Sequence, residues 1–167
     1  MVICLLNQHE LNRTTINTIK NMSDKSKELF ASIKLVNDRL NFHGIVEGCE
    51  PVSIDYTPPL GDNLGYTSLE LLLLSLSSCL GTALLTFLRK MGKTITDFKI
   101  DSHGIRKEMH PTGFSKINLK IIILSPDVTD LDMKKIIQLS EETYCPVFAM
   151  VKGNVDIETT FEVRREA

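Results

Sequence analysis

The sequence predicts an α+β fold, and three observations support this class. Segments that alternate between apolar and polar residues, as strands do, come in consecutive runs. One long helix and one shorter amphipathic helix interrupt them, giving the order strand, strand, strand, helix, strand, strand, helix, strand. Consecutive strands with few helices favour antiparallel sheets and exclude a doubly wound parallel sheet.

The chain has 167 residues, enough for one domain with a hydrophobic core. Residues 1–28 are polar and rich in Asn, Thr and Lys, and we expect them to be a loosely ordered N-terminal extension. Met22 would be a natural start, so residues 1–21 are interpreted as coming from an upstream start codon. Residues 29–167 are then the folded domain.

Composition and charge narrow the function classes. Hydrophobic content is 43% and the formal net charge is −2, so bulk charge attracts neither nucleic acid nor anionic membrane. No unbroken run of 18 apolar residues occurs, and "MVICLL" is too short for a signal-peptide core. We therefore expect a cytoplasmic protein with no membrane or nucleic-acid partner.

Four cysteines are present, and in a reducing compartment they are not expected to form a structural disulfide framework. None of them has a zinc-site spacing, so no metal is expected. The four are Cys4, Cys49, Cys79 and Cys145.

The first predicted strands are residues 32–36 and 39–47. They flank the polar pair Asn37-Asp38, which is typical of a two-residue hairpin turn. Residues 52–56, "VSIDY", predict a third strand, which ends before Pro58-Pro59.

Residues 67–91 predict the long helix. Thr67 is a favourable N-cap, Glu70 completes a capping box, and Arg89 and Lys90 lie in the last turn, where cations favour the helix dipole. This helix is apolar nearly all round, and one small sheet cannot cover it. We therefore predict an obligate homodimer in which two chains clasp their long helices.

The second half of the chain predicts two strands, a helix and a strand. Residues 96–105 and 113–124 read as strands, the second with one apolar face. Residues 129–144 read as an amphipathic helix, and residues 155–163 as the last strand. The last three of these four segments have expected inward residues: Ile117, Leu119, Ile121 and Ile123 in the first; Leu131, Ile136, Ile137 and Leu139 in the second; and Val155, Ile157, Phe161 and Val163 in the third.

Cys79 lies on a narrow stripe of small side chains along the long helix. Such a stripe either admits another backbone closely or lines a small pocket, and Gly81 also indicates a close approach. Taken alone, Cys79 and Cys145 are each better interpreted as a small buried hydrophobe than as a reactive thiol. The stripe comprises Ser75, Ser78, Cys79, Thr82 and Thr86.

Two motifs carry a family resemblance. "SLELLLLSLSSCLGTALLTFLRKMG" and "YCPVFAMVKGNVDIETTFEV" closely resemble the two cysteine motifs of the OsmC/Ohr superfamily, the osmotically induced and organic-hydroperoxide-resistance proteins of bacteria. The resemblance extends to "RLNFHG" and "HGIRKEMHPTGFSKINLKIIIL", covers roughly residues 31–165, and is strongest to the YhfA-like branch.

The resemblance implies an intertwined homodimer with sheets wrapped around long central helices. It also implies a cysteine-based thiol peroxidase that prefers organic hydroperoxides and needs no metal or organic cofactor. Cys79 would be the peroxidatic thiol and Cys145 the resolving thiol, reset by a dithiol reductant. In this family an arginine near the first hairpin activates the thiol, which makes Arg39 the candidate here. Arg106, in a polar loop, is an alternative, whereas Arg89 lies too far along the helix.

One position departs from the family pattern. The peroxidases place a glutamate ten residues before the first cysteine, where this chain has Leu69. Glu70, one residue later, is the candidate for that role, although the capping box also explains it. Leu69 favours an alternative function, namely a non-catalytic protein of the same fold that binds an apolar ligand or senses redox state.

Overall fold

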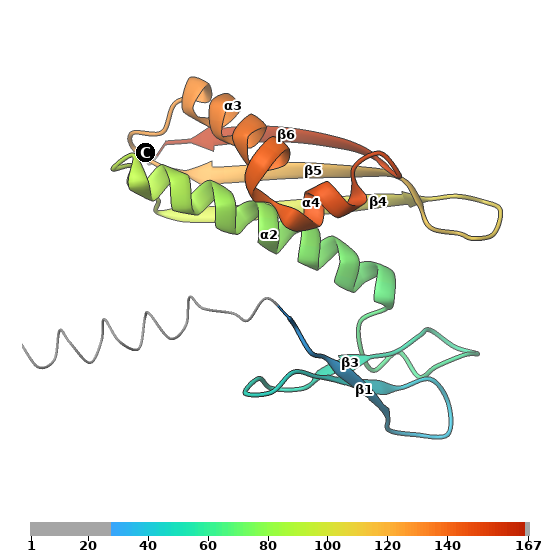
Figure 1. The fold of residues 1–167 in the computed structure, drawn as a ribbon. Helices are drawn as coiled ribbons and strands as arrows, with labels where there is room; N and C mark the ends of the chain where they lie inside the picture. Colours follow the sequence, from blue (N-terminus) through green and yellow to red (C-terminus); the bar gives the residue numbers. More distant parts are fainter. Residues whose placement is uncertain (1–27, 166–167) are drawn as a thin grey trace, which may run out of the picture. The chain divides into compact units, whose positions relative to one another are not determined.

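The computed structural model describes residues 28–165 and confirms the predicted α+β class (Figure 1). The predicted N-terminal extension, apart from its last residue, lies outside the described part. The chain forms two compact units, and the division falls between Gly65 and Tyr66.

The first unit contains an antiparallel sheet in the order β1 (Ser32–Leu35), β2 (Phe42–Ile45) and β3 (Val52–Ile54). The three predicted strands are confirmed, but the predicted two-residue turn at Asn37-Asp38 is wrong. Leu35 pairs with Phe42, so the connection runs from residue 36 to residue 41. Inside it, the Asn37 side-chain oxygen accepts hydrogen bonds from the Arg39 and Asn41 N–H groups, at 3.0 and 3.1 Å. An Asx-type loop thus replaces the tight turn.

A buried carboxylate organises the chain after β3. Asp55 is fully buried and accepts N–H hydrogen bonds from Tyr56, Asp62 and Leu64, at 2.8, 3.1 and 3.0 Å. These bonds, with the Leu64 N–H contributing most, hold the pKa of the Asp55 carboxyl below its ordinary value despite the opposing effect of burial. Gly61 is required in this loop because a Cβ there would collide with Asp55 Oδ1 and the Tyr56 backbone.

The second unit is built on a mixed sheet in the order β4 (Asp97–Arg106), β5 (Phe114–Leu124) and β6 (Asp156–Arg164). β4 and β5 form the expected antiparallel pair, whereas β6 lies parallel to β5. The expectation of purely antiparallel sheets is therefore wrong for this sheet. The helical segment between β5 and β6 provides the crossover that parallel strands need.

α2 (Ser68–Lys90) is the long helix, and its predicted bounds and caps are confirmed. Thr67 and Glu70 form the capping box, and Met91 is the C-cap. One face of α2 packs in the core with the inner side of β5, and Gly81 permits close packing because a Cβ there would lie 3.1 Å from Phe98 Cε1. The fully buried residues of this core include Leu76, Leu80, Leu84, Leu88, Ile117, Ile121 and Ile123.

The predicted helix 129–144 is two elements, and a third follows it. α3 (Asp130–Leu139) continues into the π-helical turn η1 (Ser140–Tyr144), and the short α4 (Pro146–Val151) was not predicted. α2, α3 and α4 lie on the same face of the sheet (Figure 1). Ile136 and Ile137 are buried as predicted, but Leu131 is 75% exposed, so its inward assignment is wrong.

Within residues 28–165, α2 is the one helix that is long and apolar enough to cross a membrane by length and composition. The expectation that no segment could span a bilayer depended on the lack of an unbroken run of 18 apolar residues, and α2 has none. The helix meets the less strict criterion of high mean hydropathy over a window of that length. A core helix of a packed domain passes the same test, and α2 packs against α3, α4, η1 and β4.

Candidate functional site

Cys79 lies in the middle of α2, at the edge of the hydrophobic core. Its side chain is partly buried and packs against the core cluster. The predicted stripe around it is confirmed as a distinct side of the helix, because Ser75, Ser78, Thr82 and Thr86 are all exposed within the described chain. Cys79 thus lies at the boundary between the buried leucine face of α2 and this exposed stripe.

Cys145 lies at the junction of η1 and α4, where the chain changes direction. Its N–H donates to the Ser140 carbonyl at 2.9 Å, which closes the π-helical turn. Its sulfur caps α4 by accepting the Phe148 N–H at 3.4 Å, and Pro146 begins that helix, where its missing N–H costs nothing. Cys145 is 2% exposed, so the thiol is held in the core.

The two thiols are neighbours. Both cysteines are free, and the Cys79 side chain lies close enough to Cys145 to raise its pKa. Burial, first, and the interaction with the Cys79 side chain, second, raise the pKa of the Cys145 thiol to about 12, against the opposing effect of the Phe148 N–H. The Cys145 thiol therefore stays protonated at neutral pH.

An aromatic contact, not anticipated from the sequence, joins η1 to α2 next to Cys145 in the chain. Tyr144 of η1 meets Phe87 of α2 edge-on, with ring centroids 4.7 Å apart. The Lys90 ammonium lies 5.8 Å from the centre of the Phe87 ring. In the sequence, the only sign of this contact is the aromatic residue before "CP". Its partner cannot be identified until the position of η1 on α2 is known.

Glu70 forms the predicted cap. Its carboxylate accepts hydrogen bonds from the Thr67 N–H at 2.7 Å and the Thr67 hydroxyl at 2.9 Å. These bonds, with the backbone bond contributing most, hold the pKa of Glu70 below its ordinary value. Nine residues separate Glu70 from Cys79, a rise of about 13 Å along the helix. The cap accounts for the contacts of Glu70, and its catalytic role stays a prediction.

Arg39 belongs to the first unit, where its guanidinium pairs with Asp62 at 2.9 Å and donates to the Gly61 carbonyl at 3.4 Å. These contacts fix Arg39 to the loop that Asp55 organises. Its predicted role beside Cys79 stays a prediction. Of the other arginines weighed, Arg89 is exposed at the end of α2, and Arg106 donates to the Thr112 carbonyl at 2.9 Å.

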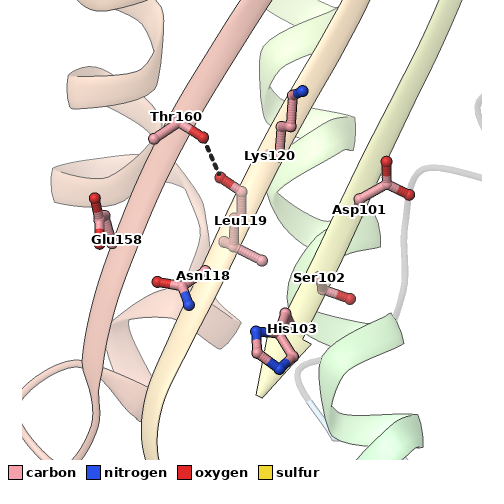
Figure 2. Close-up of a pocket in the computed structure, with 8 residues that line it drawn as sticks. All are labelled: Asp101, Ser102, His103, Asn118, Leu119, Lys120, Glu158 and Thr160. Carbon is pink, nitrogen blue, oxygen red and sulfur yellow. Dashed lines mark hydrogen bonds between the residues drawn. The ribbon is translucent and has the colours of Figure 1, made fainter. Parts of the chain in front are cut away.

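A hollow of about 410 Å³ on the polar side of the sheet offers a second place for a ligand (Figure 2). Its charged groups are already engaged, since Glu158 pairs with Lys116 at 2.7 Å and Lys120 pairs with Glu162 at 3.2 Å. Within the described residues, no group of three or more His, Cys, Asp or Glu side chains is arranged to hold a metal ion. We interpret this face as a solvated sheet surface.

Similar proteins share the fold. A crystal structure of a hypothetical protein from Aquifex aeolicus matches with a TM-score of 0.75 and 27% identity, covering 85% of this chain and 100% of that one. An organic hydroperoxide resistance protein from Elizabethkingia anophelis matches with a TM-score of 0.62 over 83% of this chain and 100% of that one. At 18% identity, the second likeness shows the fold alone.

The sequence matches are consistent with the structural ones. The Escherichia coli (strain K12) protein YhfA is 28% identical over 95 residues, which cover 57% of this chain and 71% of YhfA. The family model for OsmC-like proteins matches residues 61–160, well over half of the chain. This chain therefore belongs to the OsmC-like protein family, on the YhfA-like branch of the OsmC superfamily.

Proposed function

We propose that this protein is a thiol peroxidase that reduces organic hydroperoxides in oxidative stress defence. The observation that carries this proposal is the neighbouring pair of free thiols, Cys79 at the edge of the core and Cys145 within it. The family includes proteins named for organic hydroperoxide resistance, which supports the reaction class. The leucine-rich surroundings of Cys79 favour a peroxide with an apolar tail.

The first step oxidises Cys79. Its thiolate attacks the terminal peroxide oxygen, the O–O bond breaks, and the alkoxide leaves and becomes an alcohol after taking a proton from water. Sulfur loses two electrons, the peroxide gains them, and Cys79 becomes a sulfenic acid. Cys79 suits this step better than Cys145 because its side chain is less buried and Cys145 is held protonated.

The second step joins the two sulfurs. The Cys145 sulfur attacks the Cys79 sulfur, and the sulfenic hydroxyl leaves as water after taking the Cys145 proton. A dithiol reductant then reduces the Cys79–Cys145 disulfide by exchange and becomes a disulfide itself. No metal or organic cofactor takes part in these steps.

Intact mass spectrometry after one equivalent of cumene hydroperoxide, followed by peptide mapping, tests the proposal. We expect a mass loss of two hydrogens and a Cys79–Cys145 peptide, with neither in Cys79→Ser. Cys49→Ser is the matched control, because Cys49 is an exposed free thiol of the first unit. Protein that remains fully reduced would contradict the peroxidase proposal.

A second candidate function is a non-catalytic protein that binds an apolar ligand or senses redox state. Two observations favour it: Leu69 occupies the position of the family glutamate and packs against the core, and the Glu70 carboxylate is engaged in the cap. A co-purifying lipid-like ligand on peroxide-inert protein would support this candidate.

We also propose that two copies of the chain form a homodimer through the exposed side of α2. Leu74 is 48% exposed there, next to the small residues of the stripe. Large exposed apolar residues on a long helix favour burial against a partner. Sedimentation equilibrium at micromolar concentration should give twice the mass of one chain, and Leu74→Asp should shift it towards the monomer; a monomeric wild type would contradict the proposal.

A further inference from the structure

The ring contact between Tyr144 and Phe87 joins the segment that carries Cys145 to the helix that carries Cys79. Phe87 is eight residues after Cys79 on α2, and Tyr144 immediately precedes Cys145. The centroid distance of 4.7 Å and interplanar angle of 64° match the edge-to-face geometry that aromatic pairs favour. The contact therefore lies one residue from one thiol and about two helical turns from the other.

Apart from this neighbouring ring contact, few interactions hold Cys145 against α2. Its N–H bond to Ser140 is internal to η1, and its bond from Phe148 is internal to the start of α4. Within the described residues, the one further link from Cys145 to α2 is its interaction with the Cys79 thiol, which disulfide formation replaces. A π-helical turn is a rare local conformation that is frequent at functional sites.

Tyr144 contributes little to the core in its own right. Its side chain is 53% exposed, and within the described residues its hydroxyl makes no hydrogen bond. The ring is thus the part of Tyr144 that makes a specific contact. Because the ring is half-exposed, it buries little apolar surface. Its edge-to-face contact instead fixes the position of η1 on α2.

We propose that Tyr144 is a positioning residue that holds the Cys145 sulfur against the Cys79 sulfur for disulfide formation. The inference rests on the proposed peroxidase function, which supplies the sulfenic acid that Cys145 resolves. Tyr144 would act by keeping the two reacting sulfur atoms close together, which raises their effective concentration. Tyr144 does not touch the peroxide, and the first oxidation step does not need it.

Two measurements on Tyr144→Ala and Tyr144→Phe test the proposal. The first is the equilibrium between the reduced protein and the Cys79–Cys145 disulfide in glutathione redox buffers, which needs no peroxide chemistry. The second is stopped-flow oxidation by cumene hydroperoxide, with a dimedone-type probe that traps the sulfenic acid before it is resolved. Leu131→Ala is the matched control, because it removes another exposed apolar side chain from the same unit.

We expect Tyr144→Ala to lower the disulfide equilibrium constant, and the rate of resolution, by roughly two- to tenfold. Sulfenic acid formation should keep its wild-type rate. Tyr144→Phe, which retains the ring, and Leu131→Ala should both behave as wild type. A merely structural role would lower both oxidation steps together.

Wild-type values in Tyr144→Ala, or an equal loss in Tyr144→Phe, would overturn the proposal. A wild-type protein that forms the disulfide in glutathione but ignores cumene hydroperoxide would refute the peroxidase function, while the glutathione equilibria of the variants still decide the role of Tyr144. A wild type that forms no disulfide in glutathione would overturn both.

Discussion

Oxidation of the thiol pair should stabilise the folded chain, because the disulfide would close a long loop. Cys79 and Cys145 are 66 positions apart in the sequence, yet their side chains are close enough to interact. A cross-link that closes a loop of this length removes entropy from the unfolded chain worth about 4 kcal/mol at 25 °C. The disulfide replaces the interaction of the two reduced thiols, which is worth about 1 kcal/mol or less even if it counts as a full hydrogen bond. The net gain should therefore be about 3 kcal/mol.

Thermal unfolding of reduced and peroxide-oxidised protein at equal concentration measures this gain. For a chain of this size, about 3 kcal/mol corresponds to a rise in Tm of roughly 6–12 °C. Peroxide-treated Cys145→Ala serves as the control, because it cannot form the bond and should show no rise. Oxidised wild type with an unchanged or lower Tm would refute the reasoning, since it would mean that disulfide formation distorts α2 or η1.

Three further predictions concern the core and the titrating groups. Leu84→Ala removes a fully buried side chain of α2 and should cost about 2–5 kcal/mol of unfolding free energy in urea titrations. Because the folded-state pKa of Asp55 is lowered, its stabilisation should be present above about pH 4 and lost as the pH falls through the folded value; Asp55→Asn should flatten this acid limb of the stability curve. Because the pKa of Cys145 is raised to about 12, the reduced chain should lose stability as the pH rises from about 9 towards 12, and Cys145→Ala should not show this loss.

The sequence was sufficient for the elements with strong local signals. Thr67 and Glu70 gave both the start and the capping geometry of α2, because the capping box is a local interaction between residues three apart. Period-two alternation likewise located β4, β5 and β6 to within one or two residues. Alternation does not encode strand direction, however, and the parallel pairing of β6 follows from the crossover instead.

The wrong assignments have local physical reasons. The Asn37 side chain bonds two backbone N–H groups of its own loop, which allows a wider connection than a two-residue turn. Leu131 lies about 140° around α3 from Ile136 at 100° per residue, so the two cannot share the buried face. The six residues of α4 are too few to show helical periodicity.

The pairing of the two cysteines could not be derived from spacing, since 66 positions fix no distance. The resemblance to the OsmC/Ohr superfamily suggested it, and the surroundings of Cys145 are consistent with it. Cys145 terminates a π-helical turn and caps the next helix, so its sulfur faces inward at a point where the chain changes direction. Burial there keeps it protonated, whereas Cys79 lies at the margin of the core. The difference in environment therefore separates the two thiols chemically: the residue suited to donate a proton is the one that the fold holds most tightly.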